Sequence, residues 1–167
     1  MLLQLNKKKK SKMQQVIMKN ICTVFGLGNF TRMPGTLGSI AGVFLGLILL
    51  YFLPIQLFIV FFIFLLAASL YAIKTYQKVV GKSDKSEIII DEVLGQLLVI
   101  MFIDLEFLEI LFAFILFRFF DILKIFPANI IDKKYSDHYG IIFDDIIAAI
   151  QAIIVILIFK FNYGKFF

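Results

Sequence analysis

The sequence has few of the side chains that act as strong nucleophiles in enzymes. Cys22 is the only cysteine and His138 the only histidine among 167 residues. A single cysteine excludes an intramolecular disulfide and a multi-cysteine metal site. No phosphate-binding loop ending in arginine follows Cys22, which excludes a cysteine-dependent phosphatase. One histidine is too few for a phosphohistidine mechanism, and we expect His138 to lie in a loop without a catalytic role.

Other signatures are also missing. No Asp-x-Asp pair follows a soluble strand, as it does in aspartyl-phosphate phosphatases, and the long Asp-Gly…Ala-Arg signature of the alcohol phosphatidyltransferases is absent. The start of the chain resembles no cleavable signal peptide, because no apolar stretch follows its lysines.

Apolar side chains are abundant instead. They make up 61% of the chain, with a mean hydropathy of +0.95, whereas a soluble domain has about 45–50%. The sequence therefore predicts an all-α integral membrane protein, a compact bundle of about five hydrophobic helices with a short N-terminal amphipathic helix. We expect residues 1–12 to be a basic, flexible N-terminus and residues 13–167 to form a single membrane-embedded domain.

Hydrophobic runs of about 16–20 residues match the thickness of a bilayer. The predicted membrane spans are 36–53, 55–73, 88–103, 107–126 and 140–159. Gly38, Gly42 and Gly46 recur every four residues in the first span, which indicates close packing against another helix. Residues 13–24 have the apolar spacing of an amphipathic helix, which lies either on the membrane surface or packed on the bundle.

The distribution of lysine predicts the orientation in the membrane. The lysine-rich segments are 7–12, 74–87 and 127–139, which we expect to be loops or tails on the cytoplasmic side. Lys160 and Lys165 do not fit, because five spans place them on the other side. The lysines before the first span predict contact with anionic lipid headgroups and not with nucleic acid.

This orientation brings polar residues from distant parts of the chain to the cytoplasmic side. A charge inside a membrane helix costs roughly 2.5–3.5 kcal/mol, so such residues indicate a functional site, with anchoring at the interface as the alternative. Arg118, Asp121 and Lys124 share one helix face at i, i+3 and i+6. The candidate site residues are Asn29, Arg32, Gly35, Thr36, Asp84, Asp91, Glu92, Arg118, Asp121, Lys124, Asp144 and Asp145.

These residue types favour phosphate chemistry. Carboxylates suit Mg²⁺, while arginine and lysine suit phosphate oxygens. A metal that bridges phosphate and activates water supports phosphoryl hydrolysis, and a site at the membrane surface would meet a lipid headgroup. A small transporter or ion-pathway protein is the alternative, although the outer halves of the spans lack polar groups. A structural subunit would not explain the carboxylates.

Four segments carry a resemblance to a known family. They are 34–39 (PGTLGS), 91–96 (DEVLGQ), 117–124 (FRFFDILK) and 140–148 (GIIFDDIIA). In this order they resemble the phosphatidylglycerophosphatase A family over about residues 22–158. The resemblance implies a magnesium-dependent, multi-pass phosphatase of the cell inner (plasma) membrane with a cytoplasmic active site. It would convert phosphatidylglycerophosphate to phosphatidylglycerol and phosphate in phospholipid biosynthesis.

The resemblance also implies roles for the candidate residues. The expected magnesium ligands or general base are Asp91, Glu92, Asp121, Asp144 and Asp145, with Asp84 as a weaker candidate. Arg118, Lys124 and Arg32 are expected to hold the phosphate together with backbone N–H groups at Gly35. Thr36 and Asn29 would orient phosphate or water, or Thr36 would cap its helix. Attack by metal-activated water is favoured, and a covalent aspartyl intermediate remains open.

Overall fold

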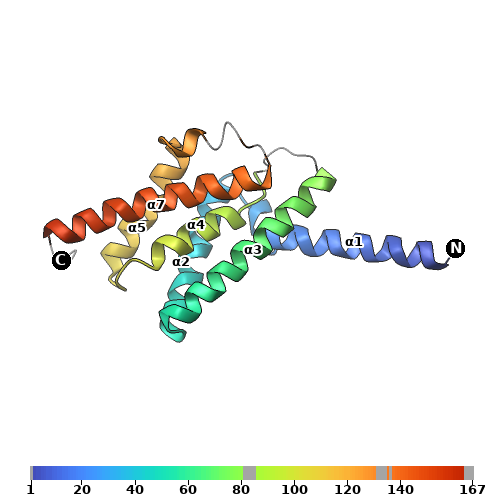
Figure 1. Ribbon diagram of the computed structural model, residues 1–167, viewed down its shortest axis with the longest axis horizontal. Coiled ribbons are helices and arrows are strands. Elements are labelled where there is room, and N and C mark those ends of the chain that lie inside the picture. The colour runs from blue at the N-terminus through green and yellow to red at the C-terminus, as the bar shows by residue number, and fades with distance from the viewer. Residues whose placement is uncertain (1, 81–85, 131–134, 136, 164–167) are drawn as a thin grey trace.

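The computed structural model describes residues 2–80, 86–130, 135 and 137–163. Within these residues the chain forms helices and no strands. The helices are α1 (Leu2–Cys22), the 3₁₀ helix η1 (Leu27–Asn29), α2 (Pro34–Phe52), α3 (Ile55–Val80), α4 (Ile90–Ile100), α5 (Phe107–Leu123) and α7 (His138–Tyr163) (Figure 1). The predicted all-α bundle of about five hydrophobic helices with a further helix at the N-terminus is confirmed.

Helix α4 is the centre of the bundle. It packs against α2 on one side and α7 on the other (Figure 1), and nine of its eleven residues are buried. At 1.5 Å per residue α4 is roughly 16 Å long, too short to cross a hydrocarbon core of about 30 Å by itself. Helix α4 is therefore shorter than the span predicted over residues 88–103, and protein rather than lipid surrounds this apolar run.

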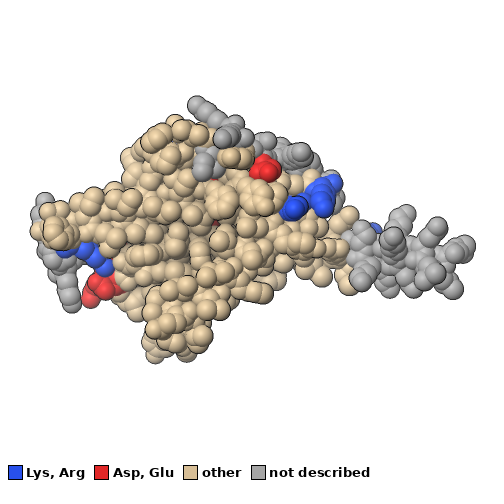
Figure 2. Space-filling view, in the orientation of Figure 1, with Lys and Arg blue, Asp and Glu red and all other residues tan. Residues whose placement is uncertain are grey.

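Three other helices have the dimensions of membrane spans. Among the described residues, Pro34–Phe52, Ile55–Lys78 and His138–Asn162 are long and apolar enough to cross a membrane. The 17 residues of α5 reach roughly 25 Å. On the face shown in Figure 2, charged side chains lie toward the two ends and the broad area between them is almost entirely uncharged. This distribution agrees with a protein embedded in a bilayer.

The glycine stripe of α2 packs on α4, as its spacing predicted. Gly38, Gly42 and Gly46 are all buried. A Cβ at Gly42 would lie 2.8 Å from Cβ of Gln96, and one at Gly46 would lie 2.8 Å from Cγ2 of Ile100. The two helices therefore run in the same direction, and the glycines let the backbone of α2 approach α4 closely. Their N-terminal ends, which carry the candidate site residues, meet at the same end of the bundle.

Several helices extend beyond the hydrophobic runs that predicted them. Helix α3 continues to Val80, so the loop expected from residue 74 begins later. Helix α1 begins at Leu2 and projects beyond the bundle (Figure 1). Gln14 of α1 donates a hydrogen bond of 3.0 Å from Nε2 to the Tyr71 hydroxyl, while Met13 is exposed. Contact of α1 with the membrane surface and flexibility of residues 1–12 stay predictions.

A second group of charges lies at the opposite end of the bundle, where α7 ends. Lys160 Nζ lies 2.5 Å from Glu109 Oε1 and 3.2 Å from Asp104 Oδ2. Glu109 is buried. The predicted orientation places Lys160 on the side where lysine is rare. Because acidic groups compensate its charge, this one lysine argues only weakly against that orientation. Lys165 lies outside the described residues, and the orientation itself stays a prediction.

Candidate active site

A cavity of about 470 Å³ opens at the end of the bundle where α2, α4 and α7 begin and α5 ends. It gathers polar residues that are far apart in the sequence. The predicted site residues in its lining are Gly35, Thr36, Asp91, Glu92, Arg118, Asp121, Lys124, Asp144 and Asp145. Four of the five polar stretches that were expected to converge therefore contribute to one cavity, and the fifth, Asp84, lies outside the described residues.

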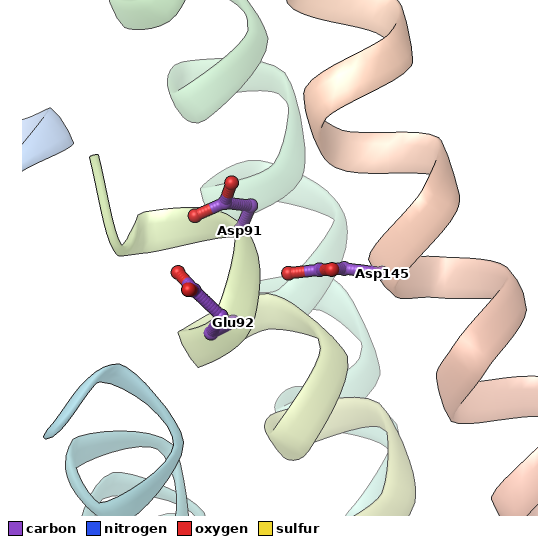
Figure 3. Close-up of side chains that lie close together, drawn as sticks. All are labelled: Asp91, Glu92 and Asp145. Carbon is purple, nitrogen blue, oxygen red and sulfur yellow. The ribbon is translucent and has the colours of Figure 1, made fainter. Parts of the chain in front are cut away.

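Three carboxylates form a compact group in this cavity. Asp91 and Glu92 lie in the first turn of α4, and Asp145 points toward them from α7 (Figure 3). One oxygen from each lies within 4.8 Å of the others. The side-chain oxygens Glu92 Oε2 and Asp145 Oδ2 are buried without a hydrogen-bond partner among the described residues. We call these three residues the carboxylate cluster.

Three carboxylates this close together in a buried site need a compensating positive charge. Carboxylates that share a buried site cannot all stay ionised at low cost, because like charges repel and burial penalises charge. The N-terminus of α4 contributes a partial positive charge near Asp91 and Glu92, but it is too small to balance three carboxylates. A bound cation would balance them, so the carboxylate cluster has the composition of a metal site.

The other two carboxylates of the cavity bind cationic side chains. Arg118 donates from Nη1 to Asp121 Oδ2 and, over 3.4 Å, to Ser39 Oγ. Lys124 donates from Nζ to Asp144 Oδ2 over 2.7 Å. Both cations line the cavity. The site thus combines the carboxylate cluster with two cations that are held by acidic partners, and one of these partners, Asp121, also interacts with Asp145 of the cluster.

The end of α5 positions Lys124. This residue is the C-cap of α5 and has a left-handed backbone with φ 44°, which non-glycine residues rarely adopt. Its N–H donates to Phe120 O over 2.9 Å. The helix therefore ends at Leu123, earlier than the predicted 126, and the side chain of Lys124 reaches Asp144 on α7. No glycine marks this helix end in the sequence.

Gly35 brings the N-terminus of α2 against the carboxylate cluster and Arg118. A Cβ at this position would overlap Glu92 Oε1 and lie 3.1 Å from both Nη1 and Nη2 of Arg118. Pro34 occupies the first turn of α2, where its missing N–H costs nothing. Backbone N–H groups at such a helix start attract anions. Any residue other than glycine at this position would displace the Glu92 carboxylate or the Arg118 guanidinium.

Comparison with known proteins supports the same chemistry. The family model of phosphatidylglycerophosphatase A matches residues 20–160. The chain belongs to this family. It is 40% identical over 138 residues to phosphatidylglycerophosphatase A of Haemophilus influenzae, covering 82% of this chain and 85% of that protein. It is 29% identical over 127 residues to phosphatidylglycerophosphatase A of Escherichia coli K12, covering 75% and 73%. No solved structure matches significantly.

Membership of the phosphatidylglycerophosphatase A family confirms the resemblance noted in the sequence, including its extent of about residues 22–158. It also confirms an enzyme, and specifically a phosphatase, over the transporter that the sequence left as an alternative.

Some predicted residues lie away from this phosphatase site. Asn29 and Arg32 are exposed and do not line the cavity, although both lie close to Gly35 in the sequence. His138 does not line it either, and it begins α7 instead of lying in a loop. Asp84 lies outside the described residues.

The structure adds residues that sequence reasoning missed. Ser86 and Tyr135 line the cavity. Each lies in a connection between helices, inside the lysine-rich segments 74–87 and 127–139, but neither side chain is charged, so residue type alone did not distinguish it. The position of Ser86 five residues before Asp91 was the only available signal.

Proposed function

We propose that this protein hydrolyses the terminal phosphomonoester of phosphatidylglycerophosphate, giving phosphatidylglycerol and phosphate, in a magnesium-dependent step of phospholipid biosynthesis. The observation that carries this proposal is the combination of the carboxylate cluster and two cations in one cavity. A phosphomonoester has a charge of about −1.5 to −2 at pH 7. Cationic side chains and a bound metal together would neutralise such a group, whereas the phosphodiester of the product carries only one charge.

Magnesium fits the carboxylate cluster by its chemistry. Mg²⁺ prefers hard oxygen ligands and combines one or two carboxylates with water and substrate phosphate. Asp91, Glu92 and Asp145 would hold it, and the buried oxygens of Glu92 and Asp145 that have no hydrogen-bond donor among the described residues support this assignment. When bound, the ion supplies charge neutralisation at the phosphate and lowers the pKa of coordinated water.

The remaining residues bind and orient the phosphate. Arg118 offers a planar fork to two phosphate oxygens, and its contacts with Asp121 and Ser39 fix the plane of that fork. Lys124 offers a compact charge and is held by Asp144. We therefore assign Asp121 and Asp144 to positioning these cations, a narrower role than the metal ligation expected for them from the sequence.

The reaction needs one proton transfer in each direction. Water attacks the phosphorus atom and loses a proton to a carboxylate of the cavity, the bond from phosphorus to the glycerol oxygen breaks, and the leaving oxygen takes up a proton. Positioning of the phosphate by Arg118 and Lys124 lowers the entropy cost of the attack.

The location of the cavity agrees with a lipid substrate. It opens at the end of the bundle where α2, α4 and α7 begin, where a headgroup would lie while its chains remain in the bilayer. The lysine distribution supports the cytoplasmic side of the cell inner membrane for this end.

Phosphate release from the purified protein in lipid discs tests the proposal. Phosphatidylglycerophosphate should be hydrolysed with Mg²⁺, not hydrolysed in chelator, and hydrolysed again when Mg²⁺ is restored. Asp91→Asn, Glu92→Gln and Asp145→Asn should each lower turnover by about 10²-fold or more. Asp104→Asn is the matched control, because this exposed carboxylate lies at the opposite end of the bundle.

Two results would contradict the proposal. Full activity in chelator would exclude the magnesium dependence. Hydrolysis of another lipid phosphomonoester with no hydrolysis of phosphatidylglycerophosphate would exclude the substrate while leaving the phosphatase chemistry intact.

A further inference from the structure

A second hollow of about 370 Å³ lies between α2 and α5. Helix α2 contributes Ile40, Val43 and Phe44 to its walls. Helix α5 contributes Phe107, Ile110, Leu111 and Phe114. All seven side chains are apolar, and several are well exposed, with Phe44 at 65% and Phe107 at 74%. We call this hollow the α2–α5 groove, and its exposed walls face lipid when the bundle is in a bilayer.

The walls of the α2–α5 groove continue into the catalytic cavity. On α2, Ile40 and Val43 follow Thr36 at i+4 and i+7, so all three share one helix face. On α5, Phe114 precedes Arg118 by four residues and lies one turn below it on the same face. Thr36 and Arg118 both line the catalytic cavity. Each wall is therefore one helical row that is polar at the cavity and apolar beyond it.

The row on α5 has room for an acyl chain. Eleven residues separate Phe107 from Arg118, which is roughly 16 Å along a helix. A groove of this length that starts beside a phosphate-binding arginine has the polarity of a phospholipid, with the charge at one end and the apolar part along the rest.

We propose that the α2–α5 groove holds an acyl chain of the phospholipid substrate while the phosphomonoester lies in the catalytic cavity. This inference rests on the proposed function and adds a second subsite to it. The expected occupant is the acyl chain of the bound substrate and not bulk lipid, because the same two helix faces line both the groove and the phosphate site.

We expect the groove to position the headgroup of the substrate and to add little to the affinity for the lipid. In a bilayer an acyl chain exchanges one apolar environment for another, so the hydrophobic effect contributes little to its binding. A chain fixed between α2 and α5 instead sets the depth of its headgroup relative to Arg118 and the carboxylate cluster. Misplacement of a reacting group by about 1 Å can lower a rate by roughly 10²-fold. Blocking the groove should therefore reduce turnover of substrates with long chains.

Leu111→Trp fills the groove from the side of α5 and tests this inference. Leu57→Trp is the matched control, because Leu57 is similarly exposed but belongs to α3 and does not line the groove. We expect Leu111→Trp to lower kcat for long-chain phosphatidylglycerophosphate by roughly tenfold or more, with no change for a short-chain, water-soluble analogue. Leu57→Trp should change neither rate. Equal losses on both substrates, a loss in the control, or no loss in Leu111→Trp would each overturn the inference.

Photo-crosslinking of the unmodified protein gives a second test that does not depend on catalysis or on folding of a variant. The probe is phosphatidylglycerophosphate with a photoreactive group in the middle of one acyl chain. Adducts should concentrate in residues 40–44 and 107–114, and unlabelled phosphatidylglycerophosphate should suppress them while phosphatidylcholine should not. Adducts spread evenly over all lipid-facing helices would show bulk lipid and overturn the inference. If the unmodified protein releases no phosphate from this lipid, the proposed function fails separately, and the adduct pattern still decides the groove.

Discussion

Replacing Gly35 with alanine should separate catalysis from folding. The added methyl group would overlap Glu92 Oε1 and approach the terminal nitrogens of Arg118 to 3.1 Å. These atoms are the ends of flexible side chains, so they can move aside without a shift of the backbone. Their movement displaces a member of the carboxylate cluster and the Arg118 guanidinium, to which we assign phosphate binding. We expect turnover to fall by about 10²-fold, the usual order of loss when a reacting group is misplaced.

The stability of the Gly35→Ala protein should change little. Alanine is more favourable than glycine in a helix by roughly 0.5–1 kcal/mol, whereas overpacking typically costs about 1–3 kcal/mol. Because the side-chain ends of Glu92 and Arg118 can move, the overpacking cost of Gly35→Ala should be near the low end of its range. The gain in helix propensity then nearly cancels this cost. The free energy of unfolding should therefore stay within about 1 kcal/mol of the unmodified protein.

Gly42→Ala is the matched control on the same helix. There the methyl group would lie 2.8 Å from Cβ of Gln96 and 2.9 Å from the backbone oxygen of Val93. Neither atom can rotate away, so α2 must move from α4 and stability should fall by about 1–3 kcal/mol. Turnover per folded molecule should fall far less than in Gly35→Ala.

Thermal unfolding and phosphate release in one detergent, at a series of Mg²⁺ concentrations, distinguish the two variants. Gly35→Ala should need more Mg²⁺ for half-maximal activity, because a ligand has moved. Unchanged turnover in Gly35→Ala would refute the close approach of α2 to the carboxylate cluster. So would equal losses of turnover in both variants at matched amounts of folded protein.

Three further predictions follow from the ion pairs and the buried thiol. Arg118→Lys and Lys124→Arg should each lower phosphate release without unfolding the protein, because a positioned phosphate distinguishes a planar fork from a point charge; normal rates in both would return these residues to anchoring. Glu109→Gln should lower the free energy of unfolding by about 1–3 kcal/mol and leave turnover unchanged, because the pair with Lys160 is remote from the cavity; a thermal melt beside a rate measurement checks this. Burial raises the pKa of the Cys22 thiol to about 12, so a maleimide should not label the folded protein at neutral pH but should label it in denaturant.

Hydropathy predicted the helices well and their ends poorly. The helix α3 contains Lys74 and Lys78, which end an apolar run but are good helix formers, so the helix continues where the hydropathy falls. The opposite error occurred for α4. Its apolar run 88–103 has the composition of a span, yet the residues are apolar because α2 and α7 enclose them. Composition reports an apolar environment and does not tell lipid from protein.

The members of the site were more predictable than their pairing. Charges in membrane helices are costly, so Asp91, Arg118 and Asp145 stood out by residue type alone. The contact between Lys124 and Asp144 depends on the left-handed end of α5 and on the packing of α5 against α7. Neither is encoded in a local pattern. For this reason the sequence predicted five carboxylates without their partners, and only the structure showed that three of them cluster and that the other two hold cations.

The enclosure of α4 has a consequence for how the enzyme meets different membranes. Helices in contact with lipid tilt or bend when the thickness of the bilayer changes. Helix α4 is almost wholly surrounded by protein, and Gly95 lets it approach α7 so closely that a Cβ there would lie 3.2 Å from the backbone oxygen of Asp145. The carboxylate cluster spans this α4–α7 contact. Its geometry should therefore respond little to the acyl-chain length of the surrounding bilayer.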